Sequence, residues 1–77
     1  MPKRSVKKSV RMTDMQGLLR DAWLTVDQLA YLYGVSVWTI RRDLDDIQGE
    51  DIRAAVVDDG KVPTRYHIIS ARGEYHG

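Results

Sequence analysis

One short segment, Gly34-Val35-Ser36, limits what this chain can fold into more than any other part of its sequence. A glycine can end a helix in the left-handed conformation, and a serine side chain can cap the first amides of the next helix. The segment therefore predicts two helices joined by a very short turn. Such a pair forms a helix-turn-helix, in which the second helix crosses the first at a steep angle.

Helical spacing of apolar residues supports both helices and adds one before them. Thr25 and Gln28 have the spacing of a capping box, which predicts a helix over residues 26–33 before the turn. Thr13 and Gln16 repeat this spacing and predict an earlier helix over residues 14–22. After the turn, a helix is expected over residues 37–48, ended by Gly49. The apolar residues that face the core from these three helices are Met15, Leu18, Leu19 and Ala22; Val26, Leu29, Ala30 and Tyr33; and Ile40, Leu44 and Ile47.

Beyond Gly49 the apolar period changes to the alternation typical of strands. Two alternating runs flank Asp58-Asp59-Gly60, which is a turn signal, so a β-hairpin is predicted. A three-residue loop there pairs Ile52 with Tyr66, Ala54 with Thr64 and Val56 with Val62. It also sets Arg53 opposite Arg65 on the outer face, with Lys61 and His67 beside them. Like charges in that position need an anion such as a phosphate, a solvent ion or the Asp51 carboxylate between them.

Charge is unevenly distributed along the chain. Residues 1–12 hold five of the 12 basic residues and no acid, whereas the other 65 residues carry 7 basic and 11 acidic side chains, a balance of −4. Because the basic segment shows no helical or strand period, we expect a flexible arm over residues 1–12. It either follows a phosphate backbone or serves as a solubilising tail. Its cations are Lys3, Arg4, Lys7, Lys8 and Arg11.

Several classes of protein are not expected. Seventy-seven residues make one small domain, which has little room for a deep, lidded active site. There is no cysteine, so we expect no disulfide and no thiolate metal site, and His67 and His76 lack the neighbours of a zinc site. The longest uncharged stretch, residues 28–40, is shorter than the about 20 residues that span a bilayer. The prediction is a soluble cytoplasmic domain that is not an enzyme and needs no cofactor or metal.

Residues 24–44 resemble the helix-turn-helix of DeoR-type bacterial regulators, most specifically in Gly34-Val-Ser followed by Thr39-Ile-Arg-Arg-Asp-Leu44. The hairpin that ends in Thr64-Arg-Tyr-His-Ile68 looks like the wing of winged-helix proteins. The resemblance implies an α+β fold, a small winged helix over residues 13–69, followed by a tail over residues 70–77. In the family, the third helix docks in the major groove of duplex DNA and the wing lies beside the backbone.

By that similarity, Ser36, Thr39, Arg41 and Arg42 are expected to meet DNA. DeoR-type regulators normally carry a large C-terminal domain that senses a sugar phosphate, whereas this chain stops at Gly77, so the resemblance implies neither an inducer nor an oligomer. Val37 and Trp38 also stand where acidic or polar residues are common in the family.

The helical period places Trp38, Arg41, Arg42 and Asp45 on the outward side of the third helix, opposite its apolar stripe. An arginine there can bond guanine O6 and N7 together, although adjacent arginines can also be solvated and paired with Asp45 or Asp46. Asp43, Asp45 and Asp46 are expected to form a solvated acidic patch.

The two tryptophans are predicted to differ in role. Trp38 points away from the core, which leaves three interpretations. DNA covers it, through thymine methyl groups or a sugar edge; a protein partner covers it; or it packs over the preceding helix. Trp23 is expected in the core between the first helix and the hairpin. Tyr31 lies on the outer side of its helix. Its hydroxyl either donates a hydrogen bond to a DNA phosphate, or the residue is an ordinary exposed tyrosine.

The sequence thus predicts a stand-alone transcriptional regulator of phage or mobile-element type. It would bind double-stranded DNA sequence-specifically and act by occupancy as a repressor, alone, as a dimer or in a cooperative array. The alternatives are a winged helix that docks on RNA polymerase or another DNA-bound factor, an architectural binder of the excisionase type, and the N-terminal domain of a longer regulator. The predicted DNA contacts are Ser36, Val37, Trp38, Thr39, Arg41 and Arg42 in the third helix; Arg53, Lys61, Arg65 and His67 in the wing; and the five cations of the arm.

Overall fold

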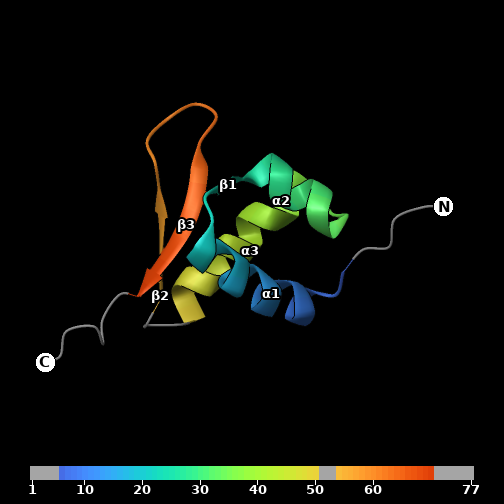
Figure 1. The fold of residues 1–77 in the computed structure, drawn as a ribbon. Helices are drawn as coiled ribbons and strands as arrows, with labels where there is room; N and C mark the ends of the chain where they lie inside the picture. Colours follow the sequence, from blue (N-terminus) through green and yellow to red (C-terminus); the bar gives the residue numbers. More distant parts are fainter. Residues whose placement is uncertain (1–5, 51–53, 71–77) are drawn as a thin grey trace, which may run out of the picture.

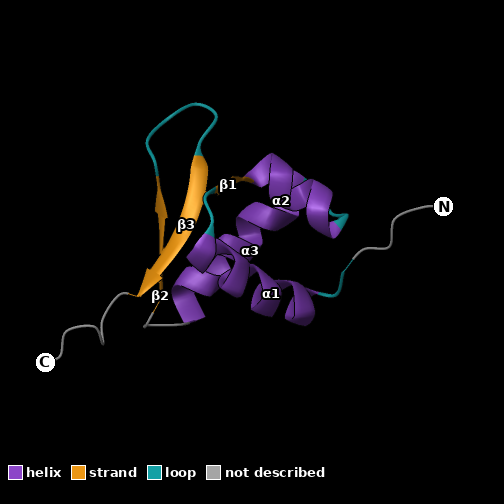
Figure 2. Cartoon of the chain, viewed as in Figure 1, coloured by secondary structure: helices purple, strands orange, loops and turns teal. Residues whose placement is uncertain are grey.

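The fold is a three-helix unit beside a small antiparallel sheet. The structure is a computed structural model that describes residues 6–50 and 54–70. Figure 1 shows the helices gathered together on one side, with the β2–β3 hairpin extending past them, and Figure 2 shows the same view by element type. The elements are α1 (Lys8–Asp21), β1 (Leu24–Thr25), α2 (Val26–Tyr33), α3 (Val37–Glu50), β2 (Ala54–Asp58) and β3 (Arg65–Ser70). This arrangement confirms the α+β winged-helix fold predicted from the sequence.

Local capping chemistry sets the turn between α2 and α3. The Thr25 side chain accepts the Gln28 amide at 3.0 Å, and the Gln28 side chain accepts the Thr25 amide at 2.8 Å, which completes the predicted capping box. Gly34 ends α2 in the left-handed conformation, with φ 69°. Ser36 then accepts the Thr39 amide at 3.1 Å and caps α3. The predicted helix-turn-helix is therefore confirmed. The predicted end of its second helix at Gly49 is wrong, because α3 continues through Gly49 to Glu50.

The predicted start of the first helix is wrong. α1 begins at Lys8 rather than at residue 14, so Thr13 lies inside the helix and is exposed. The predicted flexible arm is accordingly wrong for residues 8–12, which are helical. The N-cap Lys7 has no side-chain capping bond, so contacts with other elements must stabilise the first turn.

The main contact that stabilises the first turn of α1 is an ion pair between Arg11 and Asp43 of α3. Arg11 is 6% exposed and Asp43 is 0% exposed. The Arg11 guanidinium donates to Asp43 through Nε and through Nη2, the latter at 3.1 Å, while Nη1 donates to the Val6 carbonyl at 2.7 Å. The hydrogen bond to Asp43 raises the pKa of Arg11 above its ordinary value. Asp43 therefore does not belong to a solvated acidic patch, which corrects that prediction.

Two further polar contacts support the same region. Lys8 forms an ion pair with Asp46 on α3. The Tyr33 hydroxyl donates to the Asp14 carboxylate at 2.6 Å, and burial together with this bond raises the pKa of the Tyr33 phenol. α1 is thereby attached to both helices of the helix-turn-helix.

The predicted hairpin register is also wrong, although the faces are right. β2 pairs with β3 through Val56 opposite Ile68 and Asp58 opposite Tyr66, so residues 59–64 form a longer loop than the three residues expected. The displacement from the predicted pairs is an even number of residues, which keeps the paired residues of β2 and β3 on their predicted faces. Val62 and Thr64, predicted on the apolar face, lie instead in the loop, where Val62 is 96% exposed. β3 is the central strand, because Leu24 and Thr25 of β1 pair with its other edge.

The core lies between the helices and the inner face of the sheet. Its members come from α1, α2, α3, β2 and β3, and they include nearly all of the positions predicted from the helical period. They are Met12, Met15, Leu19, Val26, Leu29, Ala30, Tyr33, Ile40, Leu44, Ile47, Ala54 and Ile68.

Candidate nucleic-acid interface

The outward side of α3 carries the predicted DNA-contacting side chains close together. Arg41 and Arg42 are exposed, and Trp38 is 64% exposed. Thr39 is half-buried, and its hydroxyl lies 3.0 Å from that of the exposed Ser36 in the turn. Val37 differs from the other predicted contacts because it is half-buried and packs against the core. The first two turns of α3 thus form a polar and aromatic surface that the capped turn holds in place.

Trp38 and Arg42 contact each other on this surface. The Arg42 guanidinium carbon lies over the Trp38 ring, 4.9 Å from the ring centroid. A guanidinium over an indole face is a cation–π contact. Because the indole is mostly exposed, Trp38 does not pack over α2, which was one of the open interpretations.

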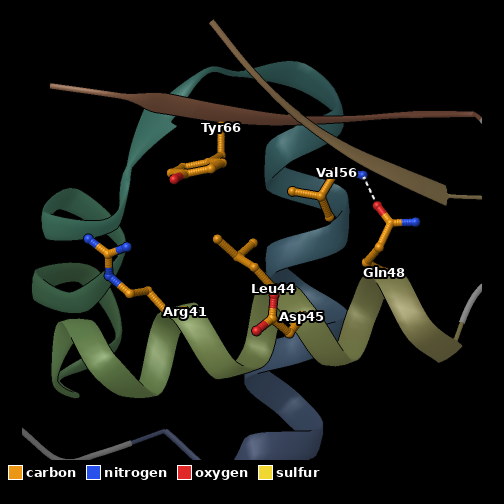
Figure 3. A pocket seen from close by; sticks show the side chains of 6 residues that line it. All are labelled: Arg41, Leu44, Asp45, Gln48, Val56 and Tyr66. Atoms are coloured by element: carbon orange, nitrogen blue, oxygen red, sulfur yellow. Dashed lines mark hydrogen bonds between the residues drawn. The ribbon is translucent and has the colours of Figure 1, made fainter. Parts of the chain in front are cut away.

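A groove of about 370 Å³ runs between α3 and the sheet. Figure 3 shows Arg41 at one end, reaching up from α3 toward the level of Tyr66, and Gln48 at the other end. The Gln48 side-chain carbonyl accepts the Val56 amide at 2.7 Å, which ties α3 to the edge strand β2. The groove is lined by Arg41, Leu44, Asp45, Gln48, Val56 and Tyr66.

One carboxylate, that of Asp59, organises the loop of the wing. It accepts the Lys61 and Arg65 amides at 3.1 Å each and the Arg65 Nε at 3.0 Å. The bonds from the Arg65 and Lys61 amides and the Arg65 guanidinium lower the pKa of Asp59 to about 2, so it stays charged at neutral pH. Asp58 accepts the Gly60 amide at 3.0 Å, and Gly60 takes a positive φ of 68° that a residue with a side chain would adopt at a cost. The tip of this ordered loop presents Lys61 and the 96% exposed Val62 to solvent.

Two of the predicted wing contacts are engaged within the protein. Arg65 forms an ion pair with Asp59 and stands opposite Thr25 rather than Arg53 in the sheet, so the predicted opposition of two arginines is wrong. His67 stacks on Trp23 with ring centroids 4.6 Å apart, and its Nδ1 donates to the Ala22 carbonyl at 3.0 Å. Trp23 is 40% exposed on this outer face and is not in the core, which corrects the prediction for it.

The arm cations fall into three groups. Lys3 and Arg4 lie outside the described residues, as does Arg53 of the wing. Lys7 is exposed just before α1. Lys8 and Arg11 are held by carboxylates of α3, as described above, so Arg11 serves the core and is not available to DNA.

Sequence reasoning missed Asp59 and the partnership of Arg11 with Asp43. A signal for the second was present, because the helical period places Asp43 on the same side of α3 as Ile40 and Ile47, where a carboxylate needs a cation. The role of Asp59 had no such signal, because an Asp-Asp-Gly run is compatible with loops of several lengths.

A helix-turn-helix with an outward third helix and a hairpin wing is the architecture of a winged-helix DNA-binding domain. The family described as the DeoR-like helix-turn-helix domain matches residues 13–55, more than half of the chain. The chain belongs to this family, which is a DNA-binding module of transcription regulation and not a catalytic one. Comparisons with curated proteins and with solved structures find no match. Among the described residues, no helix has both the length and the apolar character needed to cross a membrane.

The role of Asp59 can be tested by amide hydrogen exchange. Asp59→Ala removes the acceptor of the Lys61 and Arg65 amides, and we expect both to exchange about fivefold faster or more, as the loss of one net hydrogen bond implies. The Gly60 amide is an internal control because Asp58 accepts it. Asp59→Asn keeps one acceptor oxygen and should preserve most of the protection. Unchanged exchange at Lys61 and Arg65 in Asp59→Ala would show that other contacts order the loop.

Proposed function

We propose that this chain binds double-stranded DNA sequence-specifically, with α3 in the major groove, and represses transcription by occupying its site. The observation that carries the proposal is the pair of exposed arginines on the outward side of a capped recognition helix. Arginine is the side chain that most often takes the two major-groove acceptors of guanine together. The neighbouring turn contributes the Ser36 and Thr39 hydroxyls, which can bond to phosphates or base edges.

The wing supplies backbone contacts in this proposal, mainly through Lys61. The other described wing cations are less available, since Arg65 is paired with Asp59 and His67 donates to a backbone carbonyl. The loop tip is ordered before binding, so little conformational entropy is lost when it meets the DNA backbone. Lys7, Lys3 and Arg4 are proposed to add phosphate contacts from the start of the chain.

A single module of this size buries only about 600–1,000 Å² of protein surface on DNA. Tight binding therefore calls for two copies on one site, and we propose a dimer or a cooperative array on DNA. A palindromic or directly repeated motif would reveal which of the two arrangements is used.

Selection from a pool of random duplexes at about physiological salt tests the function. Loose electrostatic binding is largely screened there, so enrichment reports base reading. We expect an enriched motif that contains guanine. Retention without enrichment would favour an architectural binder, and no retention even at low salt would contradict DNA binding and direct attention to a protein partner.

The contribution of the first residues can be measured separately from base reading. Removing residues 1–5 deletes Lys3 and Arg4 but keeps Val6, whose amide donates to the Tyr33 carbonyl at 3.2 Å. We expect the slope of log affinity against log salt to fall by up to about 1.8, because each lost phosphate contact contributes about 0.9.

The full-length double variant Lys3→Gln, Arg4→Gln is the matched control for this truncation. It should reproduce the lower slope and leave the selected motif unchanged. An unchanged slope in both proteins would mean that this segment is a solubilising tail.

A further inference from the structure

We propose that Trp38 and Arg42 read DNA as one unit and that this unit recognises a thymine beside a guanine in the major groove. The inference rests on the proposed function, and it names the two neighbouring bases that α3 reads. In this unit Arg42 bonds the guanine, and Trp38 both holds the guanidinium and contacts the thymine methyl group.

The first step is the geometry of the pair. Trp38 and Arg42 are four residues apart in α3, so their side chains leave the helix on the same side. The guanidinium carbon lies 4.9 Å from the centroid of the indole ring, over its face. Both side chains are exposed, and the pair therefore stands out from the helix as one unit.

The second step is the freedom of the Arg42 donors. The cation–π contact sets the guanidinium over the indole face, and the guanidinium has five N–H donors, so those directed away from the ring stay available for hydrogen bonds. Asp46, which lies four residues after Arg42 and is its natural helical partner, is engaged by Lys8 from α1. The hydrogen bond from Lys8 lowers the pKa of Asp46, and the nearby charge of Arg42 adds to this shift. Arg42 donates no hydrogen bond to that carboxylate, so the indole holds the arginine in position without its donors being taken there. Such preorganisation reduces the entropy lost when the arginine bonds a base.

The third step is the place of the indole relative to the base pairs. A guanidinium that bonds guanine O6 and N7 together lies close to the plane of that base. In the proposed complex the indole and the guanidinium stack with their planes parallel, so the indole lies at the level of the neighbouring base pair, because successive pairs are separated by about 3.4 Å. The apolar group that the major groove presents at that level is the C5-methyl group of thymine. The layered pair therefore fits a thymine stacked next to the guanine that Arg42 reads.

The exposure of Trp38 agrees with this role. An indole that is 64% exposed contributes little to the stability of the free protein, so its apolar surface is available for a contact formed on binding.

The 5-methyl group of a methylated cytosine offers the same apolar contact as the methyl group of thymine. A methylated cytosine in place of the thymine should therefore preserve the contact with Trp38.

The experiment removes one methyl group from the DNA. After selection with the wild-type protein, the thymine beside the guanine is replaced by deoxyuridine, which keeps its base pairing. We expect wild-type affinity to fall about fourfold, the change expected when one methyl group is no longer buried. Trp38→Ala should bind both duplexes equally and with the lower affinity, whereas Trp38→Phe, which keeps an aromatic ring, should retain part of the difference. Deoxyuridine at a thymine elsewhere in the duplex is the DNA control.

Arg42 is tested in the same selection. Arg42→Ala should lose the preference for guanine at this step, and Trp38→Ala should weaken that preference because the guanidinium is no longer held. Circular dichroism of each variant checks that the domain is folded, as expected for two exposed positions.

The outcomes separate this inference from the function on which it rests. A wild-type motif in which no thymine adjoins the guanine, or a Trp38→Ala protein that still distinguishes thymine from deoxyuridine, would overturn the inference and leave sequence-specific binding intact. The absence of any wild-type motif would overturn both.

Discussion

Replacing Arg11 by alanine is expected to lower the free energy of unfolding by about 3–5 kcal/mol, the usual effect of removing one partner of a buried ion pair. The variant leaves the Asp43 carboxylate, which is 0% exposed, without the two guanidinium bonds that satisfy it. It also removes the donor to the Val6 carbonyl, which connects the start of the described chain to α1. Urea denaturation followed by circular dichroism measures the loss as a lower midpoint.

A folded domain of this size has a total stability of roughly 4–12 kcal/mol, so at the lower end of this range Arg11→Ala is largely unfolded at 25 °C. A compensating variant keeps the prediction testable in that case. Arg11→Met together with Asp43→Leu replaces the ion pair by apolar side chains, and we expect its stability to return close to that of the wild type.

Lys8→Ala is the matched control for Arg11→Ala. It removes a second cation of α1 that pairs with α3, but the Lys8 side chain is 49% exposed and that of its hydrogen-bonded partner Asp46 is 38% exposed. The Lys8 contact with Asp43 is longer, at 3.6 Å, and its loss leaves both guanidinium bonds to Asp43 in place. The loss should therefore be much smaller, since an exposed ion pair is solvated and screened. Equal losses in Arg11→Ala and Lys8→Ala would contradict a structural role for the buried pair.

The buried pair also explains why the N-terminal boundary could not be predicted from local signals. A capping box at Thr13 and Gln16 and a basic segment without a clear period predict a helix that starts near residue 14. The first turn of α1 forms because Arg11 and Lys8 meet carboxylates more than 30 positions away in the sequence. By contrast, the bounds of α2 and the start of α3 were predicted correctly, because Thr25, Gly34 and Ser36 act on their own neighbours.

The same contrast holds for the candidate interface. The helical period alone places Arg41, Arg42 and Trp38 on the outward side of α3, and the structure agrees. The wing contacts could not be predicted in this way. The loop brings Asp59 to Arg65, and the pairing of β1 with β3 brings the Ala22 carbonyl to His67. Alternation predicts the face of a strand residue, but it does not predict the length of the loop or the partners across the sheet.

Replacing Arg41 and Arg42 together by alanine is expected to remove most of the specific part of DNA binding. Each arginine that bonds guanine contributes about 1–3 kcal/mol of discrimination, so the double variant should lose about 2–6 kcal/mol at the selected site, or roughly 30-fold to 10⁴-fold in affinity. Both side chains are exposed, so the stability of the fold should change little. Binding to the selected duplex and to a scrambled duplex, each measured over a range of salt concentrations, gives the specific and non-specific parts.

The variant Arg41→Lys, Arg42→Lys separates the charge of these side chains from their shape. Lysine keeps the positive charge but lacks the rigid fork that matches guanine O6 and N7. We therefore expect the lysine variant to lose much of the preference for the selected duplex but to bind the scrambled duplex about as tightly as the wild type, whereas the alanine variant binds both duplexes more weakly. Both variants should keep most of the salt dependence, because the wing and the first residues supply the phosphate contacts. If the lysine variant distinguished the two duplexes as well as the wild type does, the arginines would act as phosphate contacts, and base reading would have to come from another part of α3.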